Sequence, residues 1–242
     1  MLEIERKRLI FKTKEIWFSD YPFDVGGCDS VIFRACKNKV DMKGFTREEF
    51  TTLVIDLTQD LDAIWKNMEG SCRRRIKRAK KNGVKIKLNQ NYEDFYEINR
   101  SLRKSKGLPL YDESIEFMKE CGTLFVEEFE GEIIGGHFYL EDEQNMRSLI
   151  AASKRLEVSK DMASVISDAN RLAIWEAIRY AKEKGIKEFD MGGYYTGKVK
   201  DEQKERINIF KKSFGGVLTT HYIYQKDYSK ICKLAKKIYL LK

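Results

Sequence analysis

The chain is poor in the residues that build metal centres and disulfide frameworks. Its 242 residues include only two histidines, and its five cysteines are odd in number, with no Cys-x-x-Cys pair among them. A zinc site needs several clustered cysteine or histidine ligands, and a disulfide framework needs cysteines in pairs. The composition therefore argues against both kinds of site, and we expect no bound metal.

Long apolar runs are missing as well. No stretch is long and apolar enough for a transmembrane helix, and the first residues, MLEIERKR, lack the apolar core of a signal peptide. Only two prolines and no low-complexity linker interrupt the chain. We therefore expect a cytoplasmic protein with one main domain over residues 53–242. Residues 1–52 are expected to form an extension of short strands packed on that domain.

What the chain has in excess is positive charge. Lysine and arginine outnumber aspartate and glutamate by 46 to 38, which gives a net charge of +8. This favours polyanionic partners, which are nucleic acid, phosphorylated cofactors or anionic lipid head groups. The densest cluster holds seven basic residues within 73–81. Either it is the solvated face of a helix, or Arg73, Arg74 and Lys77 contact the phosphates of tRNA or of a nucleotide-linked acceptor.

The spacing of apolar residues predicts alternating helices and strands. Helices are expected over 60–81 (with a break at Gly70), 92–104, 112–119 (capped by Asp112), 161–184 and 201–212. Strands are expected over 84–88, 123–129, 132–140, 146–152, 189–191 and 217–224. Short polar turns separate the second, third and fourth of these strands, which predicts an antiparallel meander. The order of elements indicates a mixed-sheet α/β domain.

The last segment, residues 228–242, is a basic amphipathic helix. Its apolar side carries Ile231, Leu234, Ala235, Ile238 and Leu241, and the other side carries five lysines. Two interpretations are open. The helix docks on its own domain, or it makes peripheral contact with an anionic membrane, which would suit a lipid-linked acceptor.

Two glycine-rich segments near the carboxyl end carry the strongest functional signal. They are Phe189-Asp190-Met191-Gly192-Gly193 and Ile209-Phe210-Lys211-Lys212-Ser213-Phe214-Gly215-Gly216. Glycine lets the backbone approach a ligand closely or adopt positive φ, so we expect Gly192 and Gly193 to contact substrate. Asp190 either orients an attacking amine or accepts its proton, or it only caps a loop. The pattern predicts a group-transfer enzyme.

These segments resemble a known family. Val54-Ile55-Asp56-Leu57 and the stretch 73–83 are similar to the IDL and R-x-x-I-K-K-A-x-K-x-G passages of FemABX-like transferases, and Ile134-Gly135-Gly136-His137 resembles their mid-domain strands. The two glycine-rich segments resemble their closing YD-x-GG and FK-x-x-FGG motifs. All occur in the expected order.

The resemblance implies a GNAT-like fold, with a mixed, mostly antiparallel central sheet flanked by helices. It implies transfer of an aminoacyl or acyl group from an activated donor to an amine, with no tightly bound cofactor. In FemABX proteins the donor is aminoacyl-tRNA and the acceptor is a peptidoglycan precursor peptide of the cell wall. Those proteins contain two GNAT-like domains, whereas this chain has room for about one.

The donor and the acceptor amine remain open at this stage. Related single-domain GNAT proteins use an acyl-CoA thioester and place a glycine-rich pyrophosphate loop before the long helix. Residues 152–162 occupy that place here and contain no glycine, which argues against ordinary acetyl-CoA use. A third hypothesis is an RNA-binding module without catalysis, whose affinity would depend strongly on salt.

Candidate site residues follow from the resemblance and from the residue types. The lysine that matches Lys211 neutralises the negative charge that develops during acyl transfer, and Phe210 and Phe214 belong to the same motif. Tyr194 is either a proton relay or a packing residue. His137 is either a substrate-site residue or a buried strand histidine.

Overall fold

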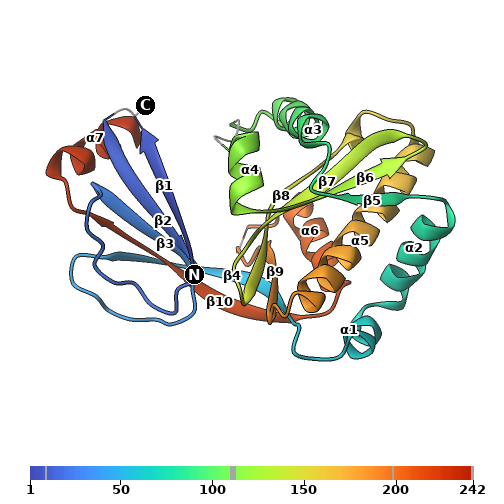
Figure 1. Ribbon diagram of the computed structural model, residues 1–242, viewed down its shortest axis with the longest axis horizontal. Coiled ribbons are helices and arrows are strands. Elements are labelled where there is room, and N and C mark those ends of the chain that lie inside the picture. The colour runs from blue at the N-terminus through green and yellow to red at the C-terminus, as the bar shows by residue number, and fades with distance from the viewer. Residues whose placement is uncertain (9, 110–112, 198, 241–242) are drawn as a thin grey trace. The chain divides into compact units, whose positions relative to one another are not determined.

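The computed structural model describes residues 1–8, 10–109, 113–197 and 199–240, which form two compact units (Figure 1). The first unit consists of Met1–Thr52 with Leu218–Lys242, and the second of Leu53–Val217. The main domain expected over residues 53–242 thus differs from the second unit at its end. The physical reason is strand pairing, because the chain after Val217 pairs with the strand Ser30–Cys36.

The first unit contains the strands at one end of the sheet order, together with one helix. Its elements are β1 (Leu2–Arg8), β2 (Phe11–Trp17), β3 (Ser30–Cys36), β10 (Val217–Asp227) and α7 (Lys230–Leu240). The strand order is β1-β2-β3-β10, with β2 and β3 parallel and the other pairs antiparallel. Ile16, Phe33 and Tyr224 form its core. The Phe33 ring meets that of Phe23 edge-on at 4.9 Å.

The second unit contains the predicted meander. Its strands are β4 (Thr46–Asp56), β9 (Glu188–Gly193), β8 (Asn145–Ser153), β7 (Glu132–Glu141), β6 (Gly122–Phe129) and β5 (Lys85–Leu88), in that spatial order. The pairs β5–β6, β6–β7 and β7–β8 are antiparallel, and β8–β9 is parallel. The meander prediction and the expected mixed, mostly antiparallel sheet flanked by helices are confirmed.

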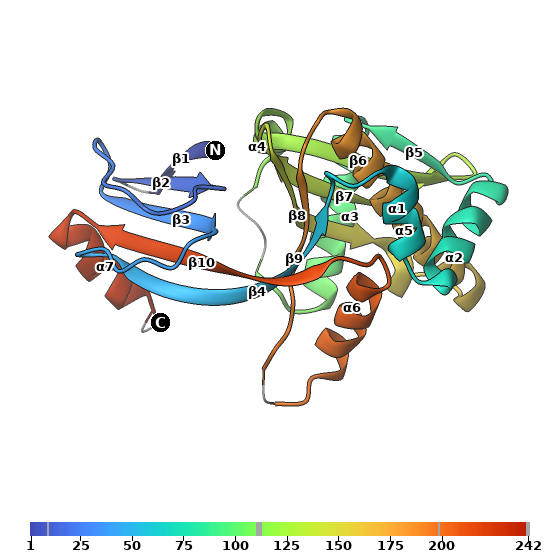
Figure 2. The ribbon, with the colours of Figure 1, turned by 90° about the horizontal axis from the view of Figure 1, so that it is seen from below.

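Helices cover both faces of this sheet. They are α1 (Leu61–Asn67), α2 (Gly70–Lys81), α3 (Tyr92–Ser105), α4 (Ile115–Cys121), α5 (Lys160–Glu183) and α6 (Glu202–Lys212). On β7, Gly136 lies against Phe95 of α3, and the next residue, His137, bonds Asn170 of α5. Successive strand residues point to opposite faces, so α3 and α5 lie on opposite sides of the sheet. Figure 2 shows α6 at the margin of the unit.

The local sequence explains these helices. The expected break near Gly70 is confirmed, since α1 ends at Asn67 and α2 begins at Gly70. Helix α5 buries Ala169, Ala173 and Ala177, whose small side chains let its backbone approach the sheet. The predicted cap Asp112 lies outside the described residues, and Ser114 caps α4 by accepting from the Phe117 N–H. Within the described ranges, no helix is long and apolar enough to cross a membrane.

Candidate active site

The candidate site lies where β8 and β9 part. The two strands pair at three positions, from Asn145↔Glu188 to Arg147↔Asp190, while β8 continues to Ser153 and β9 to Gly193. No further pairing between the two strands follows Arg147↔Asp190, and the end of β9 forms a turn of its own.

Asp190 organises the end of β9. Its carboxylate forms an ion pair with the guanidinium of Arg147, and both side chains are buried. The other carboxylate oxygen, Oδ1, accepts the backbone N–H of Gly192 at 2.7 Å. Gly192 has φ +79°, and a Cβ there would lie 3.3 Å from the carbonyl oxygen of Ser148. Asp190 therefore holds a turn that glycine accommodates readily.

Lys211 reaches the same turn from the last turn of α6. Its Nζ donates to the carbonyl oxygen of Gly193 at 2.6 Å. Burial lowers the pKa of Lys211 to about 8, with the Asp190 charge opposing this shift and the Arg147 charge adding to it. The structure thus brings together Asp190 and Lys211, which the sequence placed in one site. The result is a half-buried ammonium beside an ordered backbone turn.

Phe210 and Phe214 support Lys211 from within the fold. Phe214 is fully buried and meets the Phe210 ring edge-on at 5.5 Å. The Arg171 guanidinium of α5 lies 4.7 Å from the centre of the Phe210 ring, a cation–π distance. Phe214 is therefore a core residue that fixes the end of α6, and Phe210 is the half-buried residue of the pair.

Two tyrosines follow the Gly192–Gly193 turn. Tyr194 packs on the core, and the Lys212 Nζ lies 5.6 Å from the centre of its ring. Tyr195 is fixed by Asn208 of α6, whose amide oxygen accepts the Tyr195 N–H at 3.0 Å and whose amide group donates to the Tyr195 carbonyl at 2.7 Å. Asn208 thereby joins the loop after β9 to the helix that carries Lys211.

The basic cluster on α2 has divided roles. Arg75 donates to Oδ1 of Asp168 on α5 at 2.6 Å, and Arg78 binds the same carboxylate, so these two arginines join α2 to α5. Arg74 and Lys77 are exposed. Nη atoms of Arg73 and Arg74 lie 3.9 and 3.5 Å from where a Cβ on Gly70 would stand, at the first turn of α2.

The first turn of α2 is adjacent to the end of α6. The backbone N–H of Glu69, the residue before α2, donates to the Ser213 carbonyl at 2.9 Å. Ser213 follows α6 directly and lies two residues after Lys211. Arg73 and Arg74 lie near the start of α2, and Lys211 lies in the last turn of α6. The bond between Glu69 and Ser213 places these two helix ends in one region of the second unit.

Comparison with known proteins supports the fold and no closer relationship. No protein-family model matches the chain, and no curated protein matches its sequence. The chain shares its fold with FemX. The match to the FemX crystal structure has a TM-score of 0.64 at 13% identity and covers 86% of this chain and 74% of FemX.

Two further solved structures are similar. One is the C-terminal domain of a protein described as a lysylphosphatidylglycerol synthetase from Agrobacterium fabrum, with a TM-score of 0.56 at 12% identity, over 86% of this chain and 72% of that one. The other is L-PGS from Bacillus licheniformis, with a TM-score of 0.53 at 15% identity, over 84% of this chain and 70% of that one. The resemblance to FemABX proteins is thus confirmed at the level of fold.

His137 lies apart from Lys211. It pairs in register with Ala151, four residues along β8 from Arg147, a separation of about 13 Å along a strand. Its Nε2 lies 3.2 Å from Oε1 of Glu127 and 3.2 Å from the Asn170 side-chain oxygen, and both titratable side chains are buried. Burial raises the pKa of Glu127, and His137 opposes that rise.

Sequence reasoning missed several polar residues of this region. Arg147 is the clearest, because it is a single charge within the largely buried strand Asn145–Ser153, and such a residue needs a buried partner. Arg171 and Asn208 gave no signal, since their partners Phe210 and Tyr195 become neighbours only through folding. Glu127 lies in a strand that is buried at nearly every position, and α5 covers the face of the sheet on which its partner His137 bonds Asn170.

Proposed function

We propose that the second unit transfers an aminoacyl or acyl group from an activated donor to an amine. The observation that carries this proposal is the half-buried Lys211 ammonium, which bonds the Gly193 carbonyl where β8 and β9 part. A fixed cation at such a point stabilises the oxyanion of a tetrahedral intermediate. The fold shared with FemX supports the same class of reaction.

In this reaction the acceptor nitrogen attacks the donor's carbonyl carbon. A C–N bond forms, and the bond from that carbon to the carrier oxygen or sulfur then breaks. The nitrogen's proton leaves with the carrier atom. An ammonium has three donors, and Gly193 occupies one of those of Lys211. The others are directed to the developing oxyanion.

Asp190 is assigned to positioning. Its carboxylate is held by Arg147 and by the Gly192 N–H, so it fixes the Gly192–Gly193 turn that receives Lys211. It does not serve as the base in this scheme. Gly192, Gly193 and Tyr194 line the path of the transferred group, and Phe210 borders it beside Arg171. His137 and Phe214 act from within the core.

For the donor we propose aminoacyl-tRNA, bound through Arg73, Arg74 and Lys77. These cations are carried on the helix whose start is bonded to the end of α6, and phosphate contacts suit a polyanion. The segment between β8 and α5 forms a short 3-10 turn at Lys154–Leu156 and contains no glycine. That feature favours tRNA over acyl-CoA. The proposed acceptor is the amine of a cell-envelope precursor, as in the peptidoglycan reaction of FemABX proteins.

The test is a transfer assay with the purified chain. Labelled aminoacyl-tRNA and several acyl-CoA thioesters are offered with amine acceptors, and label in the amide product is counted. We expect transfer from aminoacyl-tRNA, reduced about 10²- to 10³-fold in Lys211→Ala by loss of oxyanion stabilisation. Lys187→Ala, which alters an exposed lysine elsewhere in the same unit, is the matched control.

Three results would contradict parts of this scheme. Full transfer by Lys211→Ala removes the assigned role of the lysine. Thermal stabilisation and turnover with an acyl-CoA but not with charged tRNA select the alternative donor. Salt-dependent binding of tRNA without turnover of any donor replaces the enzyme by an RNA-binding module.

A further inference from the structure

Helix α7 leaves an apolar stripe uncovered in the first unit. Cys232 packs inward with 2% of its surface exposed, and Lys236 pairs with Asp227 at 2.5 Å, so these residues mark the docked face. Ile231 and Leu234 are 69% and 60% exposed. Residues three apart lie on one side of a helix, so Ile231 and Leu234 form a single stripe that docking does not cover.

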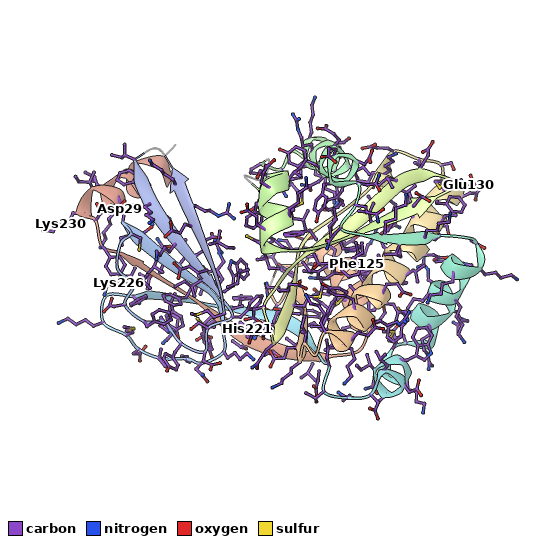
Figure 3. All side chains as sticks on the ribbon, in the orientation of Figure 1. Asp29, Phe125, Glu130, His221, Lys226 and Lys230 are labelled. Carbon is purple, nitrogen blue, oxygen red and sulfur yellow. The ribbon has the colours of Figure 1, made fainter. Side chains whose placement is uncertain are left out.

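The turn between β1 and β2 adds an exposed apolar side chain at the same end of the unit. Ile10, in that turn, is 79% exposed. Asp29 ties both segments together, because its Oδ2 accepts the Lys12 N–H at 2.8 Å and its carbonyl accepts the Tyr228 N–H at 2.8 Å. Lys12 lies two residues after Ile10, and Tyr228 lies two residues before α7 begins. Figure 3 shows Asp29 and Lys230 at this end of the unit and His221 at the other end.

The charges around the stripe are of one sign. Residues 230–242 contain five lysines and no acidic residue, and Lys230 and Lys233 are exposed beside the stripe. The nearby carboxylates are engaged, Asp227 by Lys236 and Asp24 by Lys226. An exposed apolar stripe flanked by lysines is the pattern of a helix that lies in the interface of an anionic membrane.

We propose that Ile10, Ile231 and Leu234, with Lys230 and Lys233, form a surface that docks on an anionic lipid bilayer. The three apolar side chains enter the boundary between head groups and acyl chains, and the lysines contact lipid phosphates. This inference concerns the first unit and is independent of the transferase proposal. It also reconciles the two interpretations of the terminal helix. The face with Cys232 docks on the first unit, and the face with Ile231 and Leu234 remains available for a membrane.

The experiment is vesicle flotation of the intact chain. We expect binding to vesicles that mix phosphatidylglycerol with phosphatidylcholine, little binding to phosphatidylcholine alone, and weaker binding at high salt. Ile231→Ser/Leu234→Ser lowers the affinity by about tenfold or more, since apolar side chains no longer enter the bilayer. Ile207→Ser/Ile209→Ser is the matched control, because these α6 residues are 49% and 65% exposed in the other unit.

A second variant tests the role of the lysines with substitutions that should leave the fold intact. Lys230→Glu/Lys233→Glu changes only exposed side chains and is expected to abolish the preference for anionic vesicles, with an unchanged melting temperature. Absence of binding to mixed vesicles overturns the proposal. Unchanged affinity of Ile231→Ser/Leu234→Ser overturns it in favour of simple charge attraction. A dimer in sedimentation equilibrium that this variant disperses overturns it in favour of a second copy of the chain.

Discussion

At the scale of single residues, the lowered pKa of Lys211 makes a signed prediction about pH. Its ammonium is lost as pH rises through about 8, so turnover with saturating acceptor should fall above that pH. Lys211→Arg keeps its positive charge to far higher pH, so the decrease in turnover should begin at a higher pH. The maximal rate should be lower, because the guanidinium has a different shape. Turnover measured from pH 6 to pH 10 tests this, and an unmoved fall in the arginine variant contradicts it.

Glu127 makes a prediction about stability. Burial raises its pKa above the ordinary value of 4.5, so the folded state holds this proton more tightly than the unfolded state. Its contribution to stability is present at low pH and is lost as pH rises from about 4.5 through the raised pKa. Glu127→Gln removes this loss and should be more stable than the parent at pH 8, by on the order of 1 kcal/mol. Urea unfolding at pH 8 and pH 5 checks this, and the difference in unfolding free energy between Glu127→Gln and the parent should be smaller at pH 5.

At the scale of elements, α2 and α5 are joined by the ion pairs of Arg75 and Arg78 with Asp168. Burial opposes ionisation of Asp168, but Arg78 and Arg75 outweigh it, and the pKa of Asp168 is lowered. Asp168→Asn should destabilise the fold by about 1–3 kcal/mol at pH 7, less than a fully buried pair because both arginines are partly exposed. The loss should shrink as pH falls below the ordinary pKa of aspartate.

Glu183→Gln is the control for that variant, since Glu183 is an exposed partner of Arg179 at 3.6 Å. Surface pairs of this kind contribute about 0–1 kcal/mol. Equal effects of Asp168→Asn and Glu183→Gln on the free energy of unfolding would show that α2 and α5 are held by their apolar faces alone.

Elements set by local sequence were predictable, and those set by distant pairing were not. The break at Gly70, the meander and the helix over 161–184 follow from periodicity and turn residues, which act over a few positions. The pairing of β10 with β3 joins residues about 190 positions apart, and no local pattern encodes it. The same limit applies to the site, where motifs indicated Asp190 and Lys211, whereas the partner Arg147 depends on register between strands.

At the scale of the whole molecule, two separate cores lie on one continuous chain. One core contains Phe33 and Tyr224, and the other contains Phe189 and Phe214. The chain passes from the first unit to the second within β4 and returns within β10. The two cores are therefore built from different residues.

This arrangement predicts a local response to a core mutation. Phe33→Ala removes a fully buried ring and should destabilise its unit by about 3–5 kcal/mol. Hydrogen exchange should then speed up in β1, β2, β3 and the end of β10, while amides of α5 and β7 keep their protection. Phe189→Ala is the reciprocal variant, with faster exchange in the second unit. Uniform loss of protection in both variants would mean that β4 and β10 couple the two cores into one cooperative unit.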